Sequence, residues 1–145
     1  MRFIIAATAA ALITACGQAQ NPQEERIAVT APAADTRIVA VLSYASWCGS
    51  CKALDPKVAA VQSANTFDGV AFARLDFSDR DTNAFFADAE TLGVAATMRA
   101  EFSDKVKTGR MYLIDLSSGE IISTVDKSMS EAEIASTISE AAALT

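Results

Sequence analysis

Apolar residues fill one run near residue 40 and recur at helical spacing just after it. Residues 37–44 form a continuous run rich in Val and Ile, which is typical of a strand covered on both faces in a parallel sheet. In residues 50–65 apolar side chains recur every three or four positions, which predicts a helix with one buried stripe made of Cys51, Leu54, Val58 and Val61. Pro56 lacks a backbone N–H, so we expect it to kink this helix.

A second strand is predicted over residues 69–77, and Ser78 or Asp81 can cap the helix that follows it. The apolar face of that helix is expected to consist of Phe85, Phe86, Ala89 and Leu92. Residues 93–109 have the weakest pattern of the chain; Gly93 can end the helix, and a short helix is expected over residues 95–102.

The last third of the chain predicts a hairpin and a helix. Strands at 111–116 and 120–125 are joined by a short turn that contains Gly119. Ser130 and Glu133 have the spacing of a capping box, and the helix that follows is expected to run to about residue 143. Its expected core contacts are Ile134, Ile138 and Leu144. The element order predicts an α/β domain with a mixed central sheet and helices on both faces.

Residues 1–15 have the layout of a secretory signal: one positive charge, a short apolar run and small residues. The run is too short for a comfortable membrane span. Its end, Ile-Thr-Ala-Cys, resembles the bacterial lipobox, and this resemblance implies that Cys16 is acylated and becomes the mature N-terminus. An ordinary signal peptide cut near Ala15 is the alternative and would leave Cys16 as a free thiol. A glycine directly after this cysteine, Gly17, resembles the pattern of lipoproteins that are sent to the outer membrane. The domain would then face the periplasm.

Residues 16–36 are polar and carry two of the three prolines, so we expect a flexible tether between the lipid and the domain at residues 37–145. An alternative is that Ile27-Ala28-Val29 adds a short edge strand.

Composition and charge exclude several classes of function. A chain of 145 residues that is 51% hydrophobic fits one small domain. The formal charge of −6 argues against a nucleic-acid partner, which requires clustered Lys and Arg. The sequence has no histidine, which excludes Ser-His and Cys-His nucleophile pairs. Three cysteines leave one unpaired, and a lipid on Cys16 would account for it.

The candidate chemistry lies in Trp47-Cys48-Gly49-Ser50-Cys51-Lys52, between the first strand and the first helix. Backbone N–H groups and the positive end of the helix dipole stabilise a thiolate at a helix start. Cys48 should lie there and be partly exposed, whereas Cys51 falls one turn later on the buried stripe. The two cysteines are also close enough in sequence to close a disulfide.

This motif, the element order and Pro56 together resemble the thioredoxin fold, over residues 37–143, and especially membrane-anchored periplasmic thioredoxin-like proteins. The resemblance implies that Cys48 attacks a substrate disulfide and that Cys51 resolves the mixed disulfide. Trp47 would shield the site and offer a flat contact surface, or it simply packs at the strand end. Gly49 and Ser50 lack the proline of the usual Gly-Pro dipeptide, so the pair does not assign a redox potential.

Two positions depart from the family pattern. Leu42 stands where thioredoxins keep a buried acid. Either Tyr44, Asp76 or a water takes over the role of that acid in proton transfer, or thiol exchange is slower. Gly109 or Arg110 stands where a cis-proline normally faces the cysteines. A non-proline cis bond costs about 2.5–4 kcal/mol, so a trans bond is expected. Substrate docking along this loop should therefore differ from the family pattern.

The leading hypothesis is a membrane-tethered thiol–disulfide oxidoreductase outside the cytoplasm, with no cofactor. Its partners would be protein thiols and disulfides and a redox partner protein. A soft-metal carrier for Cu(I) is an alternative, with Met98 and Met111 as extra ligands. A third hypothesis is a structural lipoprotein whose disulfide is inert.

Overall fold

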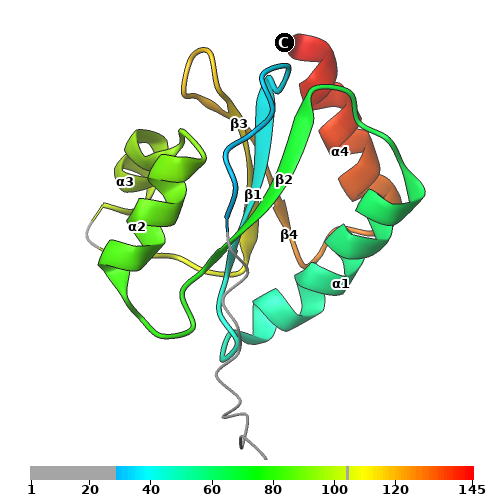
Figure 1. Cartoon of the computed structure of the whole chain (residues 1–145). Coiled ribbons are helices and arrows are strands. Elements are labelled where there is room, and N and C mark those ends of the chain that lie inside the picture. Colours follow the sequence, from blue (N-terminus) through cyan, green and yellow to red (C-terminus); the bar gives the residue numbers. More distant parts are fainter. Residues whose placement is uncertain (1–28, 104) are drawn as a thin grey trace, which may run out of the picture.

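Four strands form one mixed sheet in the computed structural model, which describes residues 29–145 except residue 104 (Figure 1). The sheet order is β2-β1-β3-β4, with β1 parallel to β2 and antiparallel to β3. The elements follow one another as β1 (Ile38–Tyr44), α1 (Gly49–Ala64), β2 (Val70–Asp76), α2 (Thr82–Thr91), α3 (Ala95–Phe102), β3 (Arg110–Asp115), β4 (Ile121–Asp126) and α4 (Glu131–Leu144). This arrangement confirms the predicted mixed sheet. The short helix expected over residues 95–102 is present as α3.

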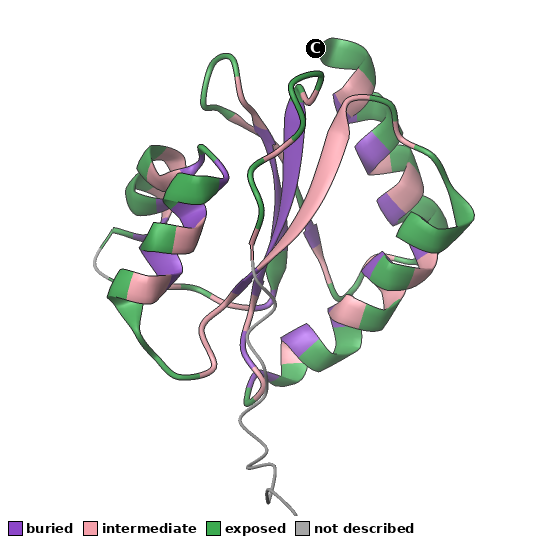
Figure 2. Cartoon of the chain, in the orientation of Figure 1, coloured by how far each residue is buried: buried purple, intermediate pink, exposed green. Residues whose placement is uncertain are grey.

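Helices cover both faces of the sheet, and β1 lies at its centre. Helices α1 and α4 pack on one face, and α2 and α3 pack on the other (Figure 1). Because side chains alternate along a strand, β1 contributes to both cores: Ile38, Ala40 and Leu42 face α1 and α4, whereas Val39 and Val41 face α2 and α3. Figure 2 shows β1 as a buried strand between the two helical layers. The continuous apolar run near residue 40 is explained by this double coverage.

The helix ends show how the local sequence determines the structure. Asp81, not Ser78, is the N-cap of α2, and its carboxylate accepts the N–H groups of Asn83 and Ala84. The predicted capping box at α4 is present, with Ser130 and Glu133 bonded in both directions. Helix α1 continues through Pro56.

Leu144 corrects one sequence prediction. It was expected in the core, but its side chain is 77% exposed at the last residue of α4. The buried side chains of this helix are Ile134, Ile138 and Ala141. The stripe that faces the sheet therefore ends at Ala141, so the last helical turn lies beyond the core.

The segment before β1 forms no strand within residues 29–37, although Val29 packs against the core under α2 and α3. Residues 27 and 28 of the alternative edge strand lie outside the described residues, as do the expected signal peptide, Cys16 and most of the tether. Within residues 29–145, residue 104 aside, no helix is long and apolar enough to cross a membrane.

Candidate redox site

Three segments meet at one edge of the sheet, where β1 ends (Figure 1). The first is the turn from β1 into α1, which carries the cysteine motif. The second is the loop between β2 and α2, and the third is the segment that leads into β3. The strand pairing brings these segments together, because β1 and β2 run parallel and stop at the same end of the sheet, where the antiparallel β3 begins. The candidate site therefore draws on parts of the chain that are far apart in sequence.

Cys48 and Cys51 form a disulfide, with their Cα atoms 5.2 Å apart. Cys48 is the N-cap of α1, and its Sγ accepts the backbone N–H of Cys51 at 3.2 Å. Cys51 is fully buried, and its Sγ lies 3.7 Å from the carbonyl oxygen of Ser43. Cys48 is 9% exposed, which is less than the partial exposure expected from the sequence. Its surroundings explain the difference: Tyr44 and Phe77 pack against the cysteine cluster, and Gly109 lies so close that a Cβ on it would be 3.4 Å from the Cys48 Sγ.

These contacts give the two sulfurs different chemistry in the dithiol. The N–H donated to Cys48 and the helix dipole both favour a negative sulfur at that position. Cys51 has a carbonyl acceptor nearby, which favours a protonated thiol that can donate to it. Burial also favours the neutral form of Cys51. The geometry therefore suits Cys48 to attack and Cys51 to hold its proton until a later step.

Trp47 lies beside the cysteines and is 48% exposed. Its indole N–H donates to the Ser78 carbonyl at 3.2 Å, and the Arg80 guanidinium lies 5.0 Å from its ring centroid. The neighbouring Ser46 N–H donates to the Ser78 hydroxyl at 2.8 Å. Arg80 has a φ of +61°, a left-handed conformation that is uncommon for a residue with a side chain. The loop after β2 therefore holds Trp47 as an exposed flat surface rather than as a packed strand-end residue.

Gly109 provides the other wall of the site. It has a φ of +93°, and a Cβ placed on it would lie 2.8 Å from the Ser50 Cβ and 3.4 Å from the Cys48 Sγ. Among the described residues no peptide bond is cis, in agreement with the expected trans geometry. Of the two candidates for the position facing the cysteines, the structure places Gly109 there. Arg110 is exposed as the first residue of β3, opposite Ser43.

The remaining residues of the motif are placed as follows. Gly49 begins α1 with open space where a side chain would be. Lys52 is exposed, and its backbone N–H donates to the Cys48 carbonyl at 3.1 Å. Both therefore belong to the first turn of the helix that presents Cys48.

Leu42 is buried, as the departure from the family pattern predicts, and lies opposite Arg74 in the β1–β2 ladder. The Arg74 guanidinium is 3.6 Å from an Asp55 carboxylate oxygen and 4.5 Å from the Tyr44 ring centroid. Asp76, another residue considered for proton transfer, accepts the Ser78 N–H at 2.8 Å. Position 42 thus supplies no acidic group. The ion pair between Asp55 and Arg74 lies in the same groove as Leu42, between α1 and β2.

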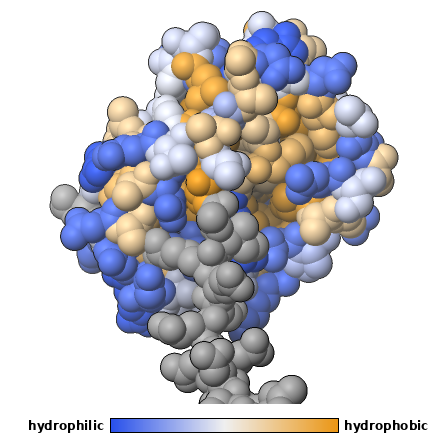
Figure 3. All heavy atoms as spheres, in the orientation of Figure 1, coloured by the Kyte–Doolittle hydropathy of each residue, from blue (hydrophilic) through white to orange (hydrophobic). Residues whose placement is uncertain are grey.

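That groove has a volume of about 290 Å³, and Leu42, Asp55 and Arg74 contribute to its wall. Its apolar wall residues include Ala40, Val58, Phe72 and Met111. Figure 3 shows apolar groups gathered on this side of the molecule, where β2 faces α1 and α4.

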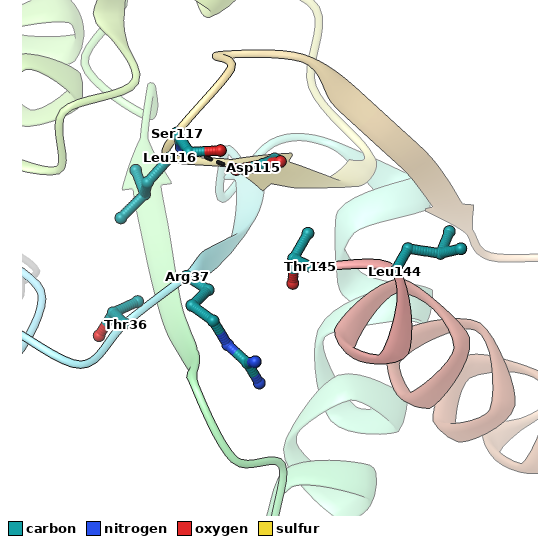
Figure 4. A pocket seen from close by; sticks show the side chains of 7 residues that line it. All are labelled: Thr36, Arg37, Asp115, Leu116, Ser117, Leu144 and Thr145. Atoms are coloured by element: carbon teal, nitrogen blue, oxygen red, sulfur yellow. Dashed lines mark hydrogen bonds between the residues drawn. The ribbon is translucent and has the colours of Figure 1, made fainter.

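A larger cavity, of about 610 Å³, lies at the opposite edge of the sheet from the cysteines (Figure 4). Arg37 and Asp115 contribute charged groups to its wall, and Leu116 and Leu144 contribute apolar ones. The Asp115 carboxylate accepts the Ser117 N–H in the adjacent turn. Hydrogen bonds from Ser117 lower the pKa of this carboxyl group. This cavity is separate from the candidate chemistry.

The other resolved pKa shifts also have structural causes. Hydrogen bonds from Ser128 lower the pKa of Asp126, and those from Ser130 lower the pKa of Glu133. Burial, followed by the nearby Glu101 carboxylate, raises the pKa of Tyr112. Its buried hydroxyl has no hydrogen-bond partner among the residues that the structure describes. Tyr112 packs edge-on against Phe102 on the α2 and α3 face, so its neutral ring belongs to the core.

Metal binding gains no support from the two methionines. Met98 is buried in the core under α2 and α3, and Met111 is buried in the core under α1 and α4. They lie on opposite faces of the sheet, so they do not complete one site together. Outside residues 1–28 and 104, no group of three or more Cys, Asp or Glu side chains is placed to hold a metal ion.

Two further residues that shape this site, Arg80 and Ser43, were not predicted from the sequence. Arg80 gives little signal in a sequence, because its contact with Trp47 depends on a loop conformation. Ser43 does give a signal: it is a polar residue in an otherwise apolar strand run, and it is the buried polar residue of the described core. A buried hydroxyl is unfavourable without a hydrogen bond, so a buried serine in an apolar strand indicates a specific contact.

A mixed sheet of this order, with a C-x-x-C pair where its central strand enters a helix, is the arrangement that the resemblance to thioredoxins predicted. Residues 24–92, just under half of the chain, match the sequence model of the thioredoxin family. The chain therefore has a thioredoxin-like α/β fold.

Among solved structures, the chain is similar to the crystal structure of StoA from Bacillus subtilis, with a TM-score of 0.48 and 16% sequence identity. The similarity covers 70% of this chain and 81% of that chain. No curated protein sequence matches the chain.

Proposed function

We propose that this protein exchanges thiols and disulfides with other proteins through Cys48 and Cys51. The observation that carries the proposal is the asymmetry of the pair. Cys48 is at a helix start and accepts a backbone N–H, whereas Cys51 is fully buried beside a carbonyl acceptor. An inert disulfide would need no such difference between its two sulfurs.

In the reducing direction, the Cys48 thiolate attacks one sulfur of a substrate disulfide. A mixed disulfide forms and one substrate thiolate leaves. Cys51 then loses its proton and attacks the Cys48 sulfur, which forms the Cys48–Cys51 disulfide and releases the second substrate thiolate. The substrate gains two electrons and the protein loses two. The reverse sequence oxidises a substrate dithiol, and the relative reduction potentials of protein and partner set the direction.

The reduction potential of the pair tests this proposal. The full chain is equilibrated in a series of glutathione buffers, and the reduced fraction is measured by mass spectrometry after alkylation. We expect a midpoint between roughly −270 and −120 mV, the range of proteins that exchange disulfides. A midpoint below about −300 mV is typical of structural disulfides and would contradict the proposal.

We further propose that the protein acts outside the cytoplasm, attached to a bacterial membrane through lipid on Cys16. The support is the lipobox-like sequence that ends at Cys16 and the polar stretch between it and the domain. In a bacterial host, the full chain should incorporate labelled fatty acid and sediment with membranes. The Cys16→Ser chain should lose both properties. Unlabelled wild-type protein released in soluble form would show that the anchor is absent.

A further inference from the structure

Ser43 occupies an unusual position in the strand that leads to the cysteines. It is fully buried, and the strand around it is otherwise apolar apart from the terminal Tyr44. A buried hydroxyl is unfavourable unless it is hydrogen-bonded. We propose that the Ser43 hydroxyl is a positioning group that holds residues 107–109 against the Cys48–Cys51 disulfide.

Two hydrogen bonds connect Ser43 to this segment. The hydroxyl donates to the Lys107 carbonyl at 2.7 Å, across 64 residues of sequence. The Ser43 carbonyl accepts the N–H of Gly109 at 2.8 Å. Ser43 pairs with Arg110 at the end of the ladder between β1 and β3, so these bonds continue the attachment beyond the sheet. One residue of β1 therefore fixes both ends of a three-residue segment.

The attachment matters because of what it places on the disulfide. Gly109 is buried, and its backbone lies close enough to Cys48 that a Cβ there would be 3.4 Å from the sulfur. The same Ser43 carbonyl that holds Gly109 is 3.7 Å from the Cys51 sulfur. Since a carbonyl oxygen has two lone pairs, it can accept both donors in the dithiol. Ser43 thus contacts the wall of the site and the resolving cysteine together.

The hydroxyl, rather than the backbone, makes this role specific to serine. Any residue at position 43 would present the carbonyl that accepts the Gly109 N–H. Residues 105–110 contain no proline to restrict the segment, and glycine is the most flexible residue. Val106 packs partly buried against the core under α2 and α3, and the Lys107 ammonium donates to the Glu101 carbonyl at 2.9 Å. These contacts hold the start of the segment but not Gly109 itself. The hydroxyl bond to Lys107 supplies the additional restraint.

The test compares Ser43→Thr with Ser43→Val, two side chains of nearly the same shape that differ in the hydroxyl. Both suit a strand. In the full-length protein reduced with dithiothreitol and then desalted, we expect Ser43→Val to raise the rate at which iodoacetamide labels Cys48. The expected rise is about twofold to tenfold, the range that loss of one ordinary hydrogen bond produces. Ser43→Thr should stay near the wild-type rate. Mass spectrometry assigns the label to Cys48 rather than to Cys16 or Cys51.

Amide hydrogen exchange separates positioning from general instability. The Gly109 amide should exchange faster in Ser43→Val, while the Leu113 amide in the centre of β3 should not. Ser63→Ala is the matched control, because the Ser63 hydroxyl also donates to a backbone carbonyl, that of Ala59 at 2.8 Å, on α1. It should change neither measurement.

Equal labelling rates in Ser43→Thr and Ser43→Val would overturn the proposal, as would equal acceleration of exchange at Gly109 and Leu113. Ser43→Ala provides a smaller substitution if the valine chain does not fold, and it should behave as Ser43→Val does. The inference rests on the proposed function only for its importance to exchange. Neither measurement uses a substrate disulfide, so failure here and failure of the proposed function are distinguishable.

Discussion

Replacing Cys48 with serine is expected to abolish disulfide exchange, with a loss on the order of a thousandfold or more, because the attacking sulfur is removed. Replacing Cys51 with alanine should have a different result. The Cys48 thiolate remains and still attacks, but the mixed disulfide has no internal thiol to resolve it. We therefore expect Cys51→Ala to accumulate covalent complexes with substrate proteins. Non-reducing gel electrophoresis of both variants in the full chain measures this contrast.

The order of alkylation is the matched control for these roles. In the reduced wild-type chain, iodoacetamide at neutral pH should label Cys48 well before Cys51, since Cys51 is fully buried and Cys48 accepts a backbone N–H. Earlier labelling of Cys51 would reverse the assignment of the two roles. Both cysteine variants should also carry Cys16→Ser in a parallel set, so that the third thiol does not contribute to trapped complexes.

Gly109→Ala should lower both stability and exchange. A side chain at the left-handed φ of +93° costs about 1–2 kcal/mol in the free energy of unfolding. The new Cβ would also lie 2.8 Å from the Ser50 Cβ, and overpacking of this kind costs about 1–3 kcal/mol more. The new side chain would crowd the wall next to Cys48, so we expect the rate of disulfide exchange to fall by about tenfold or more. A tenfold fall corresponds to an increase of about 1.4 kcal/mol in the activation barrier.

Gly93→Ala separates the two contributions. Gly93 has a similar φ of +76°, but a Cβ there would be 3.8 Å from the nearest atom, a Leu116 methyl carbon, which is an ordinary contact. Urea unfolding followed by circular dichroism should show only the cost of the left-handed φ in Gly93→Ala, without the cost of overpacking. The rate of disulfide exchange in this variant should stay near that of the wild type. Equal destabilisation by the two substitutions would mean that the segment before β3 moves aside without resistance.

Spacing alone predicted most of the fold. The alternation of β1 between two cores leaves no polar face, which is why residues 37–44 read as one apolar run. The stripe on α1 was predicted residue by residue, because helical periodicity depends only on neighbours three and four positions away. The capping box at Ser130 and the α2 cap at Asp81 are local signals of the same kind.

What the sequence could not provide depends on distant contacts. Cys48 is more covered than expected because groups from distant parts of the chain surround its cluster, among them Phe77 and Gly109, which is 61 residues away. The hydroxyl of Ser43 finds its acceptor 64 residues away, and no local pattern indicates which carbonyl that is. Leu144 has the correct spacing for the α4 stripe, yet the last turn of the helix extends past the sheet. Local periodicity identifies which face is apolar but not where its partner ends.

The fully buried position of Cys51 also affects how the pair withstands oxidants such as peroxide. An oxidant that reaches Cys48 converts its sulfur to a sulfenic acid, the first and reversible step of cysteine oxidation. Cys51 is shielded from the same reagent, yet its Cα lies only 5.2 Å from that of Cys48. Its thiol can condense with the sulfenic acid, which expels water and closes the disulfide before irreversible sulfinic acid forms. The geometry that hides one sulfur thus protects the other from irreversible oxidation.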